Sequence, residues 1–79
     1  MSRMDKVALN QLTDELYAMP GVTSVIADCE WISAAFERRP TLSQVATTLS
    51  KVERVWGGNV SVKVSLTKNS LDIYYKGDR

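Results

Sequence analysis

Apolar and polar residues alternate almost without interruption over residues 59–76, NVSVKVSLTKNSLDIYYK. A period of two is typical of a β-strand with one buried face. Lys68 and Asn69 interrupt the alternation, and Asn tolerates the left-handed backbone conformations that hairpin turns require. The segment therefore predicts a β-hairpin. Its apolar face would carry Val60, Val62, Val64, Leu66, Leu71, Ile73 and Tyr75, and its polar face Ser61, Lys63, Ser65, Thr67, Asp72, Tyr74 and Lys76.

The preceding segment, residues 41–56, has apolar residues at intervals of three and four, which is the period of an amphipathic helix. Thr41 and Gln44 have the spacing of a capping box, in which each residue satisfies a backbone N–H of the other. Gly57 and Gly58 follow directly and provide the left-handed exit that many helix ends adopt. These signals predict a helix that begins after Thr41 and ends at Trp56.

Residues 3–18 show the same helical period, and Pro20 with Gly21 would end this first helix. Ser2 with Asp5 has the spacing of a cap at its start. The apolar stripe consists of Leu9, Leu12 and Leu16, and Met19 continues it.

Two short segments lie between the predicted helices. Residues 22–27 are rich in β-branched side chains, Asp28 and Cys29 are suited to a turn, and residues 31–36 alternate again, so the sequence indicates a second hairpin. An alternative makes residues 29–38 a third helix, because small and aromatic side chains there are not specific to strands.

The resulting order is αββαββ, which predicts an α+β fold of two layers with a four-stranded, mostly antiparallel sheet and two helices on one face. The same order results when the first strand of a βαββαβ plait is moved to the C-terminus. The opposite face of the sheet would be open, and Trp31, Ser33 and Ala35 would join the polar residues of the last hairpin there. A slip of one residue would instead turn Trp31 into the core.

Composition places the chain in an ordinary class. Its 79 residues, 44% of them hydrophobic and 24% charged, suit a single globular domain over residues 1–79. The formal net charge of +1 creates no strong field for nucleic acid or an acidic membrane surface. A lone Cys29, no secretory signal pattern and no apolar run of about 20 residues favour a cytoplasmic protein rather than a secreted or membrane protein.

Groups with catalytic chemistry are scarce. The sequence has no histidine, which excludes Ser-His-Asp, Cys-His and His-metal sites. Cys29 therefore has no base beside it and is expected to be a buried or turn thiol. Asp28 and Glu30 flank a turn, and two carboxylates are too few ligands to bind a metal ion tightly. We expect a protein that is not an enzyme and uses neither a cofactor nor a metal.

Large aromatic side chains on a solvated sheet are typical of interfaces. We therefore expect Trp31, Lys63, Tyr74 and Lys76 to contact a partner, which would be another protein or a second copy of the chain in a homodimer. An unpaired edge strand offers a second route to such a partner. The roles that fit are an assembly factor, an adaptor, or a small regulator or inhibitor of the kind that phages and mobile elements encode.

An alternative function uses the basic residues. Arg38 and Arg39 precede the second helix, and Lys51 and Arg54 are neighbours on it at a spacing of three. Together they would form a phosphate-contacting surface of a nucleic-acid-binding domain. Acidic residues interrupt both pairs, which favours a solvated surface of mixed charge.

The segments MPGV at residues 19–22, AAFE at 34–37 and NVSVKVSLT at 59–67 follow one another at a spacing similar to that of the pterin-carbinolamine dehydratase family. The resemblance covers residues 12–67. The His-His-Pro segment of that family would fall at residues 55–58, where this chain has Val-Trp-Gly-Gly, and the closing helix of the family has no counterpart. The resemblance therefore implies no dehydratase activity. It implies oligomers and the use of the scaffold to bind or assemble with another protein.

Overall fold

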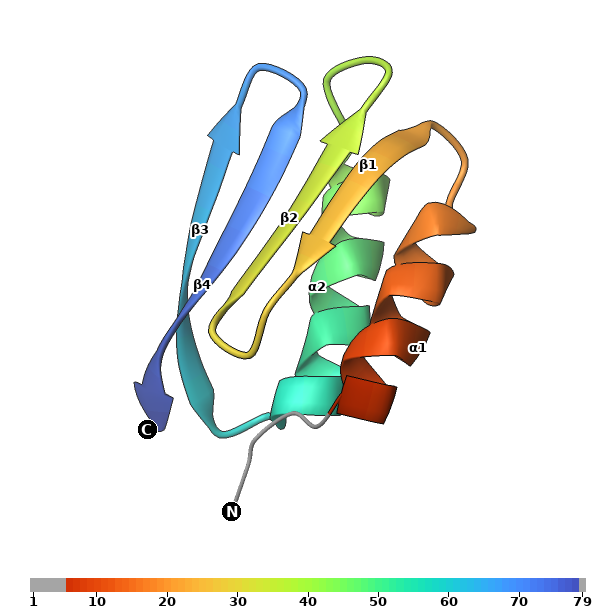
Figure 1. Ribbon diagram of the computed structural model, residues 1–79. Helices are drawn as coiled ribbons and strands as arrows, with labels where there is room; N and C mark the ends of the chain where they lie inside the picture. Colours follow the sequence, from red (N-terminus) through yellow and green to blue (C-terminus); the bar gives the residue numbers. More distant parts are fainter. Residues whose placement is uncertain (1–5, 79) are drawn as a thin grey trace.

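The computed structural model describes residues 6–78, and within them the chain forms the predicted αββαββ order (Figure 1). The elements are α1 (Lys6–Tyr17), β1 (Val22–Ala27), β2 (Trp31–Phe36), α2 (Leu42–Trp56), β3 (Val60–Thr67) and β4 (Ser70–Asp78). Residues 31–36 are a strand, so the helical alternative for residues 29–38 is wrong. The predicted cap at Ser2 lies outside the described residues.

The start of α2 is fixed by the predicted capping box. The backbone N–H of Gln44 donates to Thr41 Oγ1 at 3.1 Å, and the backbone N–H of Thr41 donates to Gln44 Oε1 at 2.8 Å. The other end of the Gln44 amide reaches back, with Nε2 donating to the carbonyl oxygen of Pro20 at 3.0 Å. One side chain therefore caps α2 and ties it to the end of α1.

Both helices end as the sequence predicts. Gly57 follows α2 with φ 98°, a left-handed value that glycine adopts without steric cost, and its N–H donates to the carbonyl of Glu53 at 2.7 Å. After α1 the chain turns at Pro20 and at Gly21, whose φ is 87°. The carbonyl of Gly21 then accepts a hydrogen bond of 2.8 Å from the N–H of Glu37, which ties the start of β1 to the end of β2.

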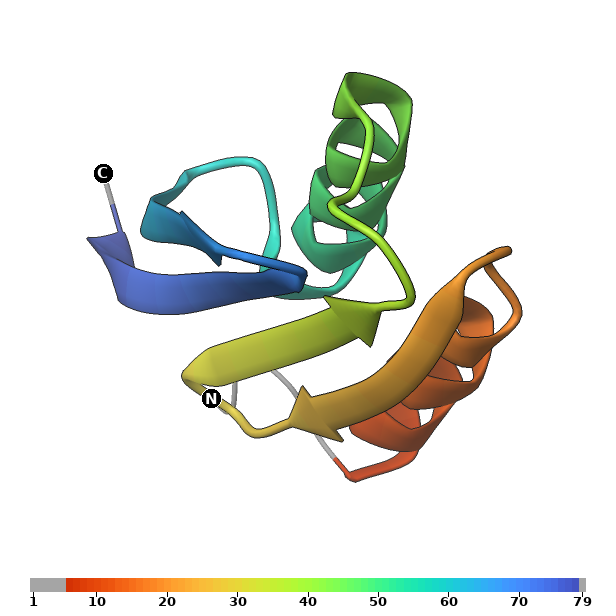
Figure 2. The same ribbon diagram turned by 90° about the horizontal axis from the view of Figure 1, so that it is seen from above.

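The strands form one antiparallel sheet in the order β1-β2-β4-β3. Each hairpin pairs its own two strands, and β2 pairs with β4 to join the halves, with Ile32 opposite Ile73 and Ala34 opposite Leu71. The order is that of a βαββαβ plait whose first strand has moved to the C-terminus. Leu12 and Leu16 of α1 share one core cluster with Val52 and Trp56 of α2, so both helices pack on the same face of the sheet. Seen from above, α2 lies over the sheet and α1 lies beside β1 (Figure 2).

The core lies between the helices and the two central strands. Leu12 and Leu16 of α1 are fully buried, and so are Ile32 of β2 and Ile73 of β4. Trp56 at the end of α2 contacts Tyr75 edge to face, with ring centroids 5.6 Å apart and planes at 77°. This contact closes the end of the core at which α2 leads into β3.

The apolar face of the last hairpin points to the helix side, as predicted, but only part of it is buried. Val64 lies opposite Ile73 in the register, yet Val64 is 42% exposed while Ile73 is 0% exposed, and Val62 is 38% exposed. The alternation identifies the face correctly and overestimates its burial. The reason is geometric, because two helices do not cover the outer strand β3.

The turn of this hairpin also differs in detail from the sequence-based expectation. The left-handed residue is Lys68, with φ 53°, and not Asn69. Asn69 is held by the neighbouring connection: its Nδ2 donates to the carbonyl of Glu37 at 3.1 Å, and its carbonyl accepts from the N–H of Phe36 at 2.9 Å. Tertiary hydrogen bonds therefore decide which of the two turn residues adopts the left-handed conformation.

The cross-strand pair Val64 and Ile73 provides a test of this burial pattern. Ile73→Ala should lower the free energy of unfolding by about 2–5 kcal/mol, because it leaves a cavity in the core. Val64→Ala should cost about 1 kcal/mol or less, since the side chain already contacts water. Chemical denaturation of both variants measures the difference, and equal losses would show that a further layer covers β3.

Candidate functional site

The open face of the sheet has its side chains in rows that cross the strands. Lys63 of β3 lies opposite Tyr74 of β4, which in turn lies opposite Trp31 of β2. These three residues, the aromatic row, therefore stand side by side on the face away from the helices. The register places Trp31 on the open face, as predicted, and not in the core.

The two rings of the aromatic row are stacked. Their centroids are 6.3 Å apart and their planes differ by 10°. Both side chains are half-buried, and the indole Nε1 of Trp31 is buried without a hydrogen-bond partner in the described part of the chain. The stack is a flat, rigid surface of a kind that is enriched in protein interfaces.

Lys76, the fourth predicted contact, is less closely tied to the row. The register of β3 and β4 shifts between Ser61 and Val62, which oppose Gly77 and Tyr75, so Lys76 is the extra residue of a β-bulge. Its side chain is exposed. The structure therefore brings Trp31, Lys63 and Tyr74 together and places Lys76 two residues farther along β4.

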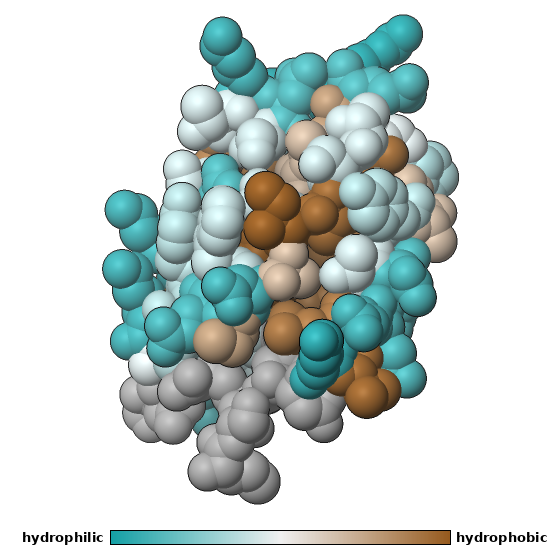
Figure 3. Space-filling view, in the orientation of Figure 1, coloured by the Kyte–Doolittle hydropathy of each residue, from teal (hydrophilic) through white to brown (hydrophobic). Residues whose placement is uncertain are grey.

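The next row of the open face consists mainly of small polar side chains, with one isoleucine at its end. Ser65, Asp72, Ser33 and Ile26 lie opposite one another across the sheet. Ile26 of β1 is 50% exposed, and sequence reasoning missed it because the alternation in β1 is interrupted by an irregularity after Val22. Figure 3 shows this side of the molecule, with apolar surface near its centre and pale or hydrophilic surface around it. The aromatic row thus belongs to a face of mixed character and low charge.

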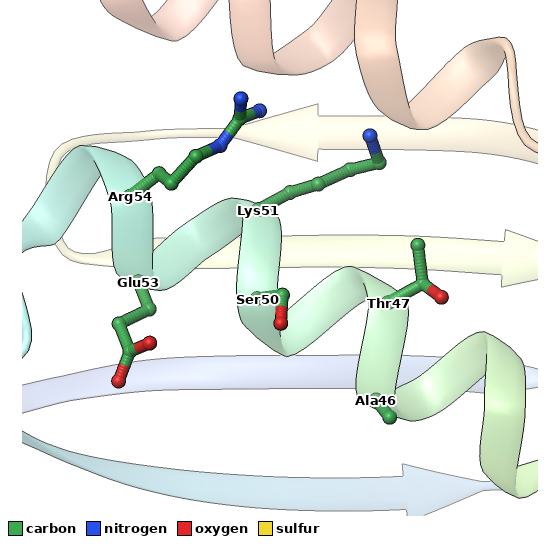
Figure 4. Close-up of a pocket in the computed structure, with 6 residues that line it drawn as sticks. All are labelled: Ala46, Thr47, Ser50, Lys51, Glu53 and Arg54. Atoms are coloured by element: carbon green, nitrogen blue, oxygen red, sulfur yellow. The ribbon is translucent and has the colours of Figure 1, made fainter.

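The basic residues of the alternative function do not gather in one place. Lys51 Nζ lies 3.4 Å from Glu15 Oε1, and Arg54 Nη2 hydrogen-bonds to the same carboxylate oxygen. Figure 4 shows both cations pointing toward α1, whereas Glu53 points the opposite way. Nine residues, or about 13 Å of helix, separate Lys51 from Leu42 at the start of α2.

The other two predicted cations lie beyond the opposite end of α2. Arg38 and Arg39 are exposed in the connection from β2 to α2. This connection is tied to the β3–β4 turn through Asn69, so Lys68 lies at the same end of the molecule. The structure therefore separates Arg38 and Arg39 from Lys51 and Arg54.

The environment of Glu15 changes the pKa of its carboxyl group. Partial burial raises the pKa of Glu15, but the hydrogen bonds and positive charges of Arg54 and Lys51 together outweigh it and hold the pKa below its ordinary value. The group is 40% exposed, so solvent screens the interaction and its contribution to stability is small. The role that follows from this geometry is to join α1 to α2.

Candidate catalytic groups stay apart in the structure. Cys29 is exposed in the β1–β2 turn, where its N–H donates to Asp28 Oδ1 at 2.7 Å. It is thus a turn thiol, one of the two predicted environments. Among residues 6–78 no group of three or more His, Cys, Asp or Glu side chains is placed to hold a metal ion.

An apolar groove between α2 and β3 is a feature that sequence reasoning missed. The cavity in it has a volume of about 230 Å³. We call it the α2–β3 groove, and it is lined by Leu49, Val52, Glu53, Trp56, Gly57, Gly58, Val60, Val62 and Ile73. The sequence indicated this groove only through the number of predicted elements. Two helices are too narrow to cover all four strands of the sheet, so part of the helix side stays open.

Of two other hollows, one lacks such walls. One, of about 500 Å³, is bordered only by side chains of α2, from Ala46 to Arg54 (Figure 4). The other, of about 210 Å³, lies beside the connection that carries Arg38 and Arg39. A depression on a single helix has no opposing wall, so the first offers little enclosure to a ligand.

Comparisons with known proteins define no relative: the chain matches no protein family, no curated protein and no solved structure. Among the described residues, neither helix is long and apolar enough to cross a membrane. The class that the structure itself defines is a small α+β domain with a four-stranded antiparallel open sheet.

The ion pairs of Glu15 with Lys51 and Arg54 should affect how the free energy of unfolding depends on pH in the acid range. Because folding lowers the pKa of this carboxyl, its stabilisation is present above the pKa of the unfolded chain and is lost as the pH falls through the lower pKa of the folded state. The free energy of unfolding, measured as a function of pH, should therefore fall more steeply in acid for the wild type than for Glu15→Gln. Gln11→Ala, which changes an exposed residue of α1 that carries no titratable group, is the control and should keep the wild-type slope. Equal slopes for Glu15→Gln and the wild type would contradict this assignment.

Proposed function

We propose that this domain is a non-enzymatic protein-interaction module that binds a partner protein through the open face of its sheet. The observation that carries the proposal is the aromatic row, in which Trp31 and Tyr74 stack beside Lys63 on a face that no helix covers. The helices lie on one side of the sheet, and the other side is a largely polar face that contains an aromatic stack. Protein interfaces commonly combine a hydrophobic centre with a polar rim in this way.

The chemistry of the face supports a protein rather than a small molecule as the partner. Serine, threonine and alanine side chains around the row leave a broad, shallow surface, and Lys63 adds one charge at its margin. Such a surface offers area and shape to another protein. Trp31 and Tyr74 would supply the largest share of the binding energy, because truncation of buried aromatic anchors costs most in interfaces.

The nucleic-acid alternative receives less support. Two of its four cations, Lys51 and Arg54, share the carboxylate of Glu15, and the other two lie beyond the far end of α2. The open face does pair aromatic rings with Lys63 and Lys76, as platforms for single-stranded nucleic acid do. It also carries Asp72 one row away from Tyr74, and a carboxylate there repels phosphates.

A tagged pull-down from the source cell tests the class of partner. The bound material should contain one stoichiometric protein, identified by mass spectrometry, and the same protein should remain after nuclease treatment. Loss of all binding after nuclease, together with an affinity that falls steeply as salt rises, would contradict the proposal and favour the nucleic-acid alternative.

Substitution of the ring pair tests the surface. Trp31→Ala and Tyr74→Ala should each weaken partner binding by at least about tenfold, the range of an interface anchor. Val7→Ala, which truncates an exposed apolar side chain of α1 outside this face, is the control and should bind as the wild type does. Circular dichroism confirms that all three variants are folded. Full binding by both sheet variants would rule out the open face as the contact surface.

A further inference from the structure

The two edges of the sheet differ in how they are protected. At the β1 edge, the outward N–H of Val25 donates to the hydroxyl of Tyr17 at 3.2 Å, and α1 lies alongside the strand (Figure 1). At the β3 edge, no described residue makes such a contact with the backbone of Val62, Val64 or Leu66. The β3 edge is therefore the open one.

The register shows which backbone groups of β3 point outward. The N–H of Tyr75 donates to the carbonyl of Glu30 at 2.9 Å, so the N–H of this residue of β4 points toward the β1–β2 hairpin and that of Tyr74 points toward β3. In an antiparallel ladder, direction alternates from one residue to the next. Lys63 and Ser65, opposite Tyr74 and Asp72, thus bond to β4, and Val62 and Val64 direct their N–H and C=O groups to the free edge.

Of these two valines, Val62 lines the α2–β3 groove, and Val64 follows it on the same face of β3. Their side chains point to the helix side and are 38% and 42% exposed. Across the groove, Leu49 and Glu53 of α2 form the other wall. Leu42 lies on the same stripe of α2, at helical spacing through Ala46 to Leu49, and is 89% exposed. Val62 of the edge strand and Leu49 of α2 therefore face one groove beside backbone groups that point to the free edge, and Leu42 is not among the residues that line it.

We propose that the β3 edge and the α2–β3 groove bind an extended segment of a partner protein as a fifth strand of the sheet. Hydrogen bonds from Val62 and Val64 would hold the backbone of the segment, and its alternate apolar side chains would enter the groove. The side chains between them would point to the open face beside Lys63, where an acidic residue complements the charge. The proposal deepens the proposed function and rests on it, since it names a second contact for the same kind of partner.

The occupant follows from the chemistry of both faces. A second copy pairing through β3 about a two-fold axis at Lys63 would place two lysines opposite each other, where like charges repel. An axis at Val64 avoids that clash, but it sets Lys63 opposite Ser65 of the second copy and leaves the charge of Lys63 without a partner across the strands. A segment with alternating apolar and acidic residues satisfies the backbone groups, the groove and Lys63 together.

The probe is a synthetic fluorescein-labelled peptide of alternating valine and glutamate, with blocked ends, titrated with the full chain and followed by fluorescence anisotropy. The wild type should bind it, and Val64→Pro should weaken binding by about 3- to 10-fold, the value of one net hydrogen bond. Proline is tolerated at an edge position whose N–H faces outward, so the β3–β4 ladder should persist. Val64→Ala keeps the N–H and is the matched control for the lost side chain.

Two further variants test the groove and the charge. Val62→Glu, which changes a residue of the groove and keeps its backbone N–H, should weaken binding of the acidic peptide, whereas Val7→Glu, at an exposed apolar position of α1, should not. Lys63→Glu should reverse the preference, so that a peptide of alternating valine and lysine binds more tightly than the valine–glutamate peptide. If Lys63→Glu still binds the valine–glutamate peptide more tightly, the proposed pairing of Lys63 with an acidic residue of the partner is wrong.

Three outcomes would overturn the inference as a whole. The first is no binding of the valine–glutamate peptide to the wild type, and the second is equal binding to Val64→Pro and Val64→Ala. The third is a dimer in sedimentation that Val64→Pro converts to a monomer, which would assign the edge to a second copy. If the captured partner still depends on Trp31 and Tyr74 in any of these cases, the proposed function stands and only the edge contact falls.

Discussion

The antiparallel pairing of β2 with β4 is the interaction on which the rest of the structure depends. It joins the two αββ units into one sheet, and it sets Ile32 against Ile73 at the centre of the core. The order β1-β2-β4-β3 follows from it. Because β2 and β4 already pair with each other, β1 can pair only with the outer side of β2, and β3 only with the outer side of β4. β1 and β3 become the edges. The helix of the first unit lies beside β1, but β3 receives no comparable cover, and the helix layer ends before the sheet does.

This mismatch between two helices and four strands explains both surfaces that we assign to binding. On one face neither α1 nor α2 covers the sheet, and the stacked rings of Trp31 and Tyr74 stand among small polar residues. On the other face the helix layer stops at α2, which leaves Val62 and Val64 partly exposed and Val62 at the α2–β3 groove. A domain of this size buries only about 60–65% of the surface of its unfolded chain. Val62 and Val64 are among the large apolar side chains that stay exposed.

Local signals predicted most of the fold. The capping box of Thr41 and Gln44, the glycine after α2 and the alternation of β3 and β4 each depend on a few neighbouring residues, and the structure confirms them. The strand order, the exposure of Val62 and Val64, and the left-handed Lys68 were not predictable from such patterns. All three depend on long-range contacts: the pairing of β2 with β4, the limited reach of α2, and the bonds of Asn69 to Glu37 and Phe36. Of the candidate site, the sequence identified the residues of the aromatic row but not their alignment.

The central claim is that the surfaces left uncovered by the helices are the functional ones. The most direct test is nuclear magnetic resonance of the isotope-labelled chain during titration with the purified partner protein. The account predicts that the largest shift changes fall on Trp31, including its indole N–H, and on Lys63 and Tyr74. Changes confined to Arg38, Arg39 and the outer side of α2, with the sheet residues unaffected, would contradict it.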